Sequence, residues 1–478
     1  MQYSAENNAD HLTSPQSLSK PSSKSPTKSS PRKSLSEWLE YIGSIHVSAI
    51  DMGLERVLPV ARRLGLLGAK IGDSDKKPFV FTVAGTNGKG STTATIAAIC
   101  KAAGLKTALY QSPHLVSFTE RVRIDGAEAS SDELIAAFEA VEQARLDEGL
   151  SLSFFEMTTL AALLIFKQAN CDVWVLEIGL GGRLDVVNII EPDVCVITNV
   201  GIDHTDWLGD DIEKIGAEKA GIIRKHSKVI LGAQTLPDSV YQIAQSLNAQ
   251  TYQLGKDYAV CDERADFWYY SSQSLTCKLP KPRLSVQNAA NAVSAVIASG
   301  LPISTKQLAQ GLSVVRLAGR FDERVIKGRR WLFDVAHNDH GLAFLLAQFL
   351  PHWQAHKAKY PQAKLHTVFS MLGDKDVGKV LSLLQAHIDA DDGVSAEFRV
   401  ADWHVAAIDH VRAMPLDAVI ANMTTHLNLP KIHTYDTLDA ASQGAISASD
   451  EQDLILVFGS FHTIGETLLA LGEASIAA

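Results

Sequence analysis

The sequence has 478 residues, of which 46% are hydrophobic and 21% charged, and its formal net charge at pH 7 is -10. A chain of this length predicts two or three domains, each able to bury a core without a metal or disulfide staple. The acidic balance argues against broad nucleic-acid binding, which needs a basic surface. No apolar run approaches the ~18 residues that span a bilayer, so we expect no membrane partner.

The five cysteines lie far apart in the sequence, and no two of them form a C-x-x-C pair. Such spacing predicts neither a disulfide framework nor a zinc site. We expect buried free thiols in a reducing cytoplasm. The residues concerned are Cys100, Cys171, Cys195, Cys261 and Cys277.

Within residues 1–35, the stretch TSPQSLSKPSSKSPTKSSPRKS is rich in Ser, Pro and Lys and has almost no apolar side chain. Such a segment cannot bury enough surface to offset its ordering entropy, so we predict a disordered tail. It lacks the apolar core of a secretory signal. Its single arginine and lack of an amphipathic pattern also argue against a transit peptide.

Folded sequence is predicted to begin near Ser36, where SEWLEYIGSIH offers an N-cap serine and helical apolar spacing. Residues 79–84 form an apolar run of strand length, and a glycine-rich loop follows. A helix is expected over residues 91–103, ending at Gly104, and a second strand over residues 106–110. This strand–loop–helix–strand order predicts parallel strands with a right-handed crossover.

Two further apolar runs, residues 173–178 and 194–200, have the composition of strands buried on both faces. Each precedes a loop dense in Gly, Asp, Asn or His, namely GLGGRLDVVN and GIDHTDWLGD. Because ligands bind at the carboxyl ends of strands in open parallel sheets, we expect the three loops to converge on one site.

A second alternating region begins near Asp322, with short predicted strands in RWLFDVA, LHTVFSM, EFRVA and DLILVFG. The predicted fold is therefore α/β. A P-loop-type domain with a mostly parallel sheet is expected over residues 36–318, and a smaller Rossmann-like domain over residues 319–478.

The loop GTNGKGS, residues 85–91, departs from the usual phosphate-binding spelling, in which a hydroxyl residue follows Gly-Lys at once. Gly85 and Gly88 can adopt positive φ and crowd backbone N–H groups around an anion. Lys89 can stand between phosphate oxygens, and Ser91 or Thr92 can reach a metal ion. The helix N-terminus adds partial positive charge. An ordinary tight turn is the alternative, but the order of strand, loop, lysine and hydroxyl favours a nucleotide site.

Three further residues could carry chemistry. Glu177, near a strand end, resembles the metal-holding acid of P-loop enzymes, and an ion pair with Arg183 is the alternative. His204 could be a metal ligand, although magnesium prefers oxygen. Lys219 lies among small residues, and a solvated lysine beside Glu218 is its alternative.

Other candidates follow predicted strands. Ser112 and His114 lie where ligands collect, although Ser-Pro also simply ends a strand. Asp334 follows the first strand of the second domain and could bind ribose hydroxyls or a metal, or could cap the next helix.

Seven motifs in register resemble the folylpolyglutamate synthase/dihydrofolate synthase family, which is similar to the muramyl ligases. They are GTNGKGS, SPHLVSFTERVRIDG, EIGLGGRLDVVN, DHTDWLG, EKAGIIR, AGRFD and DVAHN. The resemblance runs from about Ser36 to the C-terminus, and IDMGLERV resembles the bifunctional bacterial members. Asp339 departs from the pattern, because many relatives have proline there, and we expect little effect on the chemistry.

The resemblance implies an ATP-dependent ligase that adds L-glutamate to dihydropteroate and to tetrahydrofolates through an acyl phosphate. Lys89, Glu177, His204 and Lys219 are the implied catalytic residues. ATP is the implied co-substrate, held by Gly85, Thr86, Asn87, Gly88, Lys89, Gly90, Ser91, Asn288, Arg320 and Asp334. No Ser–His–Asp set is required.

The resemblance also implies two magnesium ions and a monovalent cation. The implied magnesium ligands are Ser112, Glu177, His204 and Lys219, the last as a carbamyl-lysine. The implied pterin-substrate positions are Asp51, Met52, Gly53, Leu54, Ser153, Phe155, Leu184, Asp185 and Val186. A cytoplasmic monomer with small-molecule partners is expected.

Two other functions stay open. One is a muramyl ligase acting on a nucleotide-sugar substrate, although its sugar-nucleotide N-terminal domain is not apparent in the sequence. The other is a nucleotide-dependent binding protein without ligase activity, against which the joint presence of Glu177, His204 and Lys219 argues.

Overall fold

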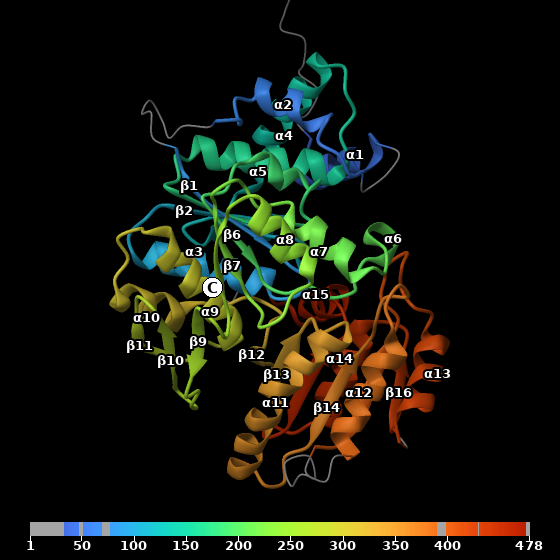
Figure 1. Ribbon diagram of the computed structural model, residues 1–478. Coiled ribbons are helices and arrows are strands. Elements are labelled where there is room, and N and C mark those ends of the chain that lie inside the picture. Colours follow the sequence, from blue (N-terminus) through green and yellow to red (C-terminus); the bar gives the residue numbers. More distant parts are fainter. Residues whose placement is uncertain (1–32, 47–50, 69–76, 390–397, 429, 475–478) are drawn as a thin grey trace, which may run out of the picture.

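The computed structural model describes residues 33–46, 51–68, 77–389, 398–428 and 430–474. Nearly all of the predicted N-terminal tail lies outside these residues. Figure 1 shows two α/β bodies: the blue-to-yellow part of the chain builds one, and the orange-to-red part builds the other. Among the described residues, no helix is long and apolar enough to cross a membrane.

The larger body is built on an eight-stranded sheet with the order β4-β3-β2-β5-β1-β6-β7-β8. Six neighbouring strands, from β2 to β8 in this order, pair in parallel, whereas β3 and β4 form an antiparallel edge. The strands are β1 (Phe79–Ala84), β2 (Thr107–Tyr110), β3 (Val122–Ile124), β4 (Ala127–Glu128), β5 (Val173–Glu177), β6 (Val194–Ile197), β7 (Lys228–Leu231) and β8 (Gln250–Gln253).

Strand β5 inserts between β1 and β2, so the two strands of the predicted strand–loop–helix–strand unit lie two positions apart. From β1 the chain moves first toward β2 and later, through β6, toward the opposite edge. The strand order thus reverses beside β1, and crevices for ligands form at the carboxyl ends of strands at such a point.

Both faces of this sheet are buried. On β1, Phe81 and Val83 pack into one apolar cluster with α3, α9 and α10, whereas Val80 and Ala84 face the other. The helices of the first face are α3 (Lys89–Ala102), α9 (Val286–Ser299) and α10 (Thr305–Val314). Those of the second are α1 (Leu35–Ser44), α2 (Val57–Arg63), α4 (Ser131–Asp147), α5 (Phe154–Gln168) and α8 (Asp238–Ser246).

Shorter elements complete this body. A three-stranded antiparallel sheet contains β9 (Tyr258–Cys261), β10 (Phe267–Ser272) and β11 (Thr276–Pro280), and packs on the same side as α9. The loops beyond β2, β5 and β6 carry η1 (Phe118–Arg121), η2 (Val186–Ile189), α6 (Thr205–Leu208) and α7 (Ile212–Ala220).

The second body has a six-stranded sheet with the order β12-β13-β17-β14-β15-β16, parallel except for β12. Its strands are β12 (Asp322–Ile326), β13 (Arg329–Asp334), β14 (Leu365–Phe369), β15 (Val400–Ala406), β16 (Ile432–Tyr435) and β17 (Leu454–Phe458). Its helices are α11 (Asp339–Lys359), α12 (Val377–Asp389) and α13 (Leu416–His426) on one face, and α14 (Leu438–Ala448) and α15 (Phe461–Leu471) on the other.

The predicted α/β fold class is confirmed, but several local expectations need correction. Helix α1 is capped by Ser34 rather than Ser36, and α3 begins at Lys89 rather than Ser91. The motif EFRVA contributes only its end to β15. Two of the five cysteines are not buried: Cys261 is exposed and Cys277 is half-buried.

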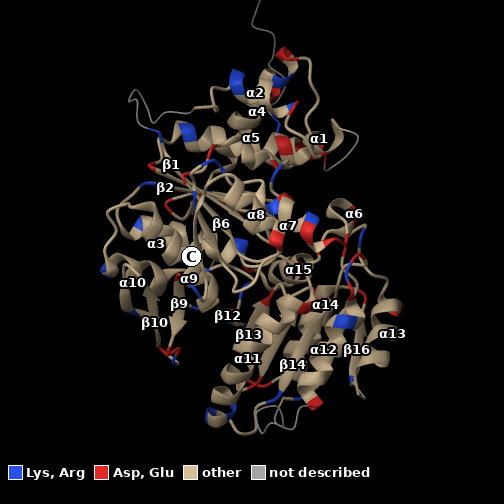
Figure 2. Ribbon diagram, in the orientation of Figure 1, with Lys and Arg blue, Asp and Glu red and all other residues tan. Residues whose placement is uncertain are grey.

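Acidic and basic residues are intermingled over both bodies, as Figure 2 shows.

Candidate functional site

A cavity of about 540 Å³ lies at the carboxyl ends of β2, β5, β1 and β6 and reaches the second body. Its walls include the glycine loop after β1, Ser112 and His114 after β2, Glu177 at the end of β5, and His204 after β6. The predicted convergence of loops on one site is therefore observed. The second body contributes six polar residues: Arg320, His337, Lys375, Arg412, Ser460 and His462.

The glycine loop has the backbone that its sequence suggested. Gly85 and Gly88 have φ of 151° and 84°, in the region where glycine is favoured. A Cβ on Gly88 would lie 2.4 Å from Asn288 Oδ1, so the loop touches α9 closely. Asn199 anchors the loop from β6, because its Oδ1 accepts hydrogen bonds from the backbone N–H of Thr86 and Asn87 at 3.2 and 2.9 Å.

Lys89 is the first residue of α3, and its Nζ donates to the carbonyl oxygens of Gly85 and Thr86 at 3.0 and 3.2 Å. Burial lowers the pKa of Lys89, while Glu177 opposes that change. The ammonium group thus lies within its own loop, where a phosphate oxygen could replace these carbonyl contacts.

Glu177 is 5% exposed at the end of β5. Burial raises the pKa of its carboxyl group to about 7, although Lys89 and Arg320 pull it downward. Arg183, the alternative partner considered for Glu177, pairs with a different acid: its Nη2 lies 2.6 Å from Glu218 Oε1. The alternative of an ion pair between Glu177 and Arg183 is therefore wrong, and Glu177 lines the cavity.

Lys219 is also 5% exposed, so the alternative of a solvated lysine beside Glu218 is wrong. Its Nζ donates to Gly85 O at 3.2 Å, and burial lowers its pKa to about 7. Lys219 lines a small cavity of about 10 Å³ together with Lys89 and His204. Burial lowers the pKa of His204 to about 4, so its ring is neutral at neutral pH, the form that binds metals.

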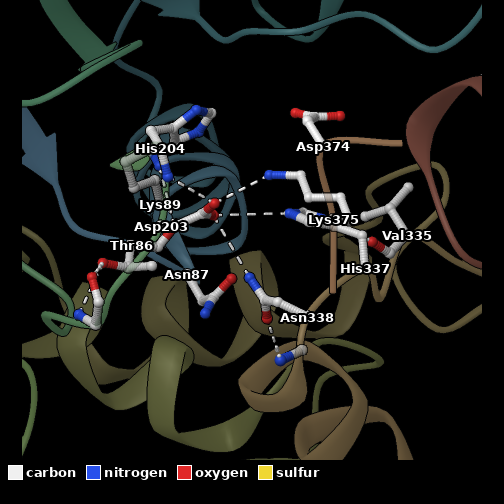
Figure 3. A network of polar contacts seen from close by, with 12 residues as sticks. Thr86, Asn87, Lys89, Asp203, His204, Val335, His337, Asn338, Asp374 and Lys375 are labelled. Carbon is white, nitrogen blue, oxygen red and sulfur yellow. Dashed lines mark hydrogen bonds and ion pairs between the residues drawn. The ribbon is translucent and has the colours of Figure 1, made fainter. Parts of the chain in front are cut away.

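Asp203 joins the two bodies beside His204 (Figure 3). Its Oδ1 lies 2.9 Å from Lys375 Nζ, and its Oδ2 lies 3.5 Å from Asn338 Nδ2 and 3.9 Å from His337 Nε2. These contacts hold the pKa of Asp203 below its usual range. A loop of the first body is thus tied to the segments that follow β13 and β14 in the second.

The predicted ATP residues gather mostly around a neighbouring cavity of about 60 Å³. Asp334 accepts hydrogen bonds from the N–H groups of Phe321 and Ala336, whereas Asn338 caps α11, so the capping alternative for Asp334 is wrong. The predicted residues on this wall are Asn87, Gly88, Gly90, Ser91, Asn288, Arg320 and Asp334. Sequence reasoning missed Leu284, Phe344, Leu345 and Gln348 beside them.

Seven of the nine predicted pterin positions line the large cavity, namely Asp51, Met52, Ser153, Phe155, Leu184, Asp185 and Val186. Gly53 and Leu54 are not among its lining residues. Arg56 explains how Asp51 is fixed, because its guanidinium bonds Asp51 Oδ2 at 2.9 Å and Glu156 Oε1 at 2.8 Å. Asp185 accepts three backbone N–H bonds, yet burial raises its pKa to about 6.

Sequence reasoning also missed Arg121, His337, Lys375, Arg412 and His462, all of which line the cavity. For His337 and Lys375 a signal was available, because both follow strands of the second body, where ligands collect. His462 carried the same signal, because it lies in the first turn of α15 just after the parallel strand β17. Arg121 carried none, since it lies at the end of η1, well beyond β2.

Comparison with known proteins identifies the family to which the chain belongs. Residues 83–299 match the family model of the Mur ligase middle domain, and residues 319–461 match that of the Mur ligase, glutamate ligase domain. The chain is 40% identical to the dihydrofolate synthase/folylpolyglutamate synthase of Escherichia coli, over 91% of this chain and 94% of that protein. The chain belongs to this family. The Haemophilus influenzae relative is 33% identical over 90% and 96% of the two chains.

Solved structures give the same result. E. coli FolC in complex with DHPP and ADP superposes with a TM-score of 0.80 at 38% identity, covering 92% of this chain and 98% of that one. A bifunctional folylpolyglutamate synthase/dihydrofolate synthase with Mn, AMPPNP and L-glutamate bound has a TM-score of 0.78 at 37% identity, over 92% and 98%. The family expected from the motifs is thus confirmed and favoured over a muramyl ligase.

The side chains around the cavity fit the expected metal only in part. Within the described ranges, no three or more His, Cys, Asp or Glu residues are grouped as a metal site. Glu177 and His204 supply one donor each, and Ser112 a hydroxyl. The buried amine of Lys219 carries the wrong charge for a metal ligand, so it would fit a magnesium site only after gaining a carboxylate. The residues therefore fit a metal held jointly with substrate oxygens.

Proposed function

We propose that this protein is an ATP-dependent ligase that joins L-glutamate to dihydropteroate and to tetrahydrofolates. The observation that carries this proposal is the single cavity that joins a phosphate-binding loop, a buried carboxylate and an aromatic, partly apolar wall. The relatives support it, since their solved structures contain ADP, AMPPNP, Mn, DHPP and L-glutamate. The two reactions would be those of a dihydrofolate synthase and a tetrahydrofolate synthase.

The nucleotide would lie along the glycine loop and the cavity beside it. Backbone N–H groups at the start of α3 and the Lys89 ammonium would hold the phosphates. Asn288, Arg320 and Asp334 border the adjacent cavity, where base and ribose would bind. At about 60 Å³ this space is smaller than a nucleoside, so we expect side chains such as Gln348 to move when ATP binds.

The chemistry would proceed in two steps. The substrate carboxylate attacks the γ-phosphorus of ATP, which gives an acyl phosphate and ADP. The amino group of L-glutamate then attacks the acyl carbon, inorganic phosphate leaves, and the amine proton is lost as the amide forms. Lys89 would offset negative charge on the transferring phosphoryl group. Both steps depend on positioning and on exclusion of water, so no protein nucleophile is needed.

Magnesium would be held by Ser112, Glu177, His204 and a carbamylated Lys219. The proposal includes two magnesium ions and one monovalent cation. When bound, magnesium would neutralise phosphate charge and orient the γ-phosphoryl group. Glu177 must be ionised to act as a ligand, and a nearby cation lowers the pKa of a carboxyl group, so metal binding favours that form. The catalytic set would be Lys89, Glu177, His204 and Lys219.

We also propose the division at residues 318 and 319, which is supported by the start of the second sheet at Asp322. In this view the two domains close around ATP and exclude water from the acyl phosphate. A cytoplasmic monomer stays a prediction.

Phosphate release from the purified protein tests the proposal directly. We expect release that requires ATP, magnesium and L-glutamate together, with either dihydropteroate or tetrahydrofolate as acceptor. The folate products should be identified by mass spectrometry. Absence of glutamate-dependent turnover with both acceptors would overturn the proposal, and turnover with a nucleotide-sugar acceptor alone would favour a muramyl ligase.

A further inference from the structure

Arg121 is a cation of the large cavity whose role the proposed reaction leaves unexplained. It ends η1, and its Nε donates to His114 Nδ1 at 2.9 Å. Among the described residues, no carboxylate lies within 4.0 Å of its guanidinium. The adjacent acid is otherwise engaged, because Glu120 accepts hydrogen bonds from the N–H groups of Leu115, Val116 and Ser117 at 2.6–2.8 Å.

The surroundings hold Arg121 in place without neutralising it. Its Cζ lies 5.2 Å from the ring of Phe118 and 5.9 Å from that of Phe154. His114 accepts from the arginine, and burial lowers its pKa to about 4, so its ring is neutral at neutral pH and does not balance the arginine's charge. A desolvated guanidinium that faces a cavity without a counter-ion is costly, and an anionic ligand would offset that cost.

Arg121 lies outside the cavity assigned to the base and ribose of ATP. It lines the large cavity but neither the small cavity with Asn288 and Asp334 nor the one with Lys219. Its aromatic neighbour Phe154 lies in the wall between Ser153 and Phe155, so Arg121 borders the part of the cavity expected to hold the acceptor substrate.

The other cations of the large cavity have acidic neighbours. Lys375 pairs with Asp203 at 2.9 Å, and Arg412 with Asp374 at 3.4 Å. The charge of Lys89 acts on Glu177, and that of Arg320 acts on Asp334 and Glu177. Arg121 also feels the charge of one acid, Glu120, but that carboxylate already accepts three backbone N–H bonds, so the guanidinium can still bind a further anion.

The two proposed acceptor substrates differ by one such anion. Dihydropteroate has a single carboxylate, the one that reacts. A folate that ends in glutamate reacts through its γ-carboxylate and keeps the neighbouring α-carboxylate. We propose that Arg121 binds this α-carboxylate and thereby determines how well the enzyme accepts γ-glutamyl substrates relative to dihydropteroate. The inference rests on the proposed function and adds a specificity-determining residue to it.

Steady-state kinetics of Arg121→Gln with both acceptors tests this assignment. Charge-assisted hydrogen bonds contribute enough that we expect KM for tetrahydrofolate to rise about tenfold or more. The kcat/KM for dihydropteroate should change by less than about threefold, and that activity also reports correct folding. The increase should be the same for tetrahydrofolate monoglutamate and diglutamate, because each has one α-carboxylate beside the reacting group. Arg121→Lys, which keeps the charge without the planar fork, should recover part of the loss.

A second measurement removes the ligand group instead of the side chain. Replacing the terminal α-carboxylate of tetrahydrofolate by a carboxamide should raise KM about tenfold for the wild type and leave KM of Arg121→Gln nearly unchanged. Equal losses in both proteins would overturn the inference. An increase in KM for L-glutamate with both acceptors would also overturn it, since Arg121 would then bind the incoming amino acid. If Arg121→Gln fails to fold, Arg121→Met, which also removes the charge, takes its place in the cycle.

Failure of this inference differs from failure of the proposed function. Wild-type protein that uses both acceptors while Arg121→Gln keeps their ratio contradicts only the role of Arg121. Wild-type protein that uses neither acceptor contradicts the ligase itself.

Discussion

Lys219 illustrates how burial can change the chemistry of one residue. Its amine lies against the glycine loop, 3.2 Å from Gly85 O, and burial lowers its pKa to about 7. A large fraction of the amine is thus uncharged at neutral pH, and only the uncharged amine adds CO₂. Carbamylation would convert this cation into an anionic oxygen donor beside His204.

We therefore expect Lys219→Ala to lose at least about a hundredfold in kcat, because it removes a metal ligand that positions the phosphoryl group. Short carboxylates such as acetate or propionate should restore part of the activity by entering the space left behind. Lys225→Ala, at the chain's next lysine, serves as control. Lack of rescue together with an unmodified Lys219 in the intact-protein mass would contradict carbamylation.

Gly88 offers a second residue-scale prediction. Alanine there would need a φ of 84° and would place its Cβ 2.4 Å from Asn288 Oδ1. We expect Gly88→Ala to raise KM for ATP about tenfold or more and to lower stability by about 1–2 kcal/mol, because positive φ is strained for alanine.

Gly104→Ala is the matched control. Gly104 has a similar φ of 80°, but a Cβ there would meet nothing within 4 Å. It should lower stability by a similar amount and leave KM for ATP unchanged. Equal ATP kinetics of the two variants would show that the contact with Asn288 does not matter.

At the scale of elements, strands β14, β15 and β16 carry a buried polar cluster. His404 is 1% exposed, and its Nδ1 lies 3.0 Å from Tyr435 Oη. His366, on β14, is fully buried, 3.4 Å from Asp453 Oδ2 and 3.6 Å from Asp402 Oδ2. Burial lowers the pKa of both rings, to about 4 for His404.

This cluster makes stability depend on pH. Between about pH 6.5 and about pH 4 the unfolded chain binds a proton at His404 that the folded chain does not, so the free energy of unfolding falls as the pH is lowered. The loss should reach about 2–3 kcal/mol, since each pKa unit corresponds to about 1.4 kcal/mol. Urea unfolding at several pH values measures it.

His404→Asn should flatten this pH dependence, because asparagine does not titrate. The exposed His226 provides the matched control, and His226→Asn should leave the slope unchanged. An unchanged slope in His404→Asn would assign the acid sensitivity to other groups, with His366 as the next candidate.

At the scale of the whole molecule, Asp203 is one of the residues whose contacts join the two bodies at the site (Figure 3). Its ion pair with Lys375 has both side chains 14% exposed, so solvent screens it only partly. Because Asp203 precedes His204, the approach of the second body and the position of that histidine are linked through one loop.

A double-mutant cycle measures this link. Asp203→Asn and Lys375→Met should each lower kcat/KM, and their combination should cost less than the sum, with a coupling of about 1–2 kcal/mol. Lys379→Met is the control, because Lys379 is 61% exposed and pairs with Asp339 within the second body. If the losses in kcat/KM are strictly additive, the contact between Asp203 and Lys375 does not contribute to catalysis.

Much of this site could be predicted from the sequence because its signals are local. Each signal spans only a few neighbouring residues: a strand-length apolar run, a glycine that requires positive φ, or a polar residue directly after a strand. These local signals are enough to predict that Lys89, Glu177 and His204 lie near one another. The order of the seven motifs then identifies the family.

Which side chains contact one another within the site was decided only by the tertiary structure. Lys219 meets Gly85 across 134 residues, and Lys375 meets Asp203 across 172. Arg183 pairs with Glu218 rather than Glu177. Arg121 forms no ion pair in the described part of the chain, although Glu120 is its neighbour in sequence. Spacing along a chain determines local conformation, whereas burial and charge pairing depend on which distant segments share a volume. The sequence by itself therefore determined the loops and the family, and the folding of the chain determined the charge and environment of each side chain within them.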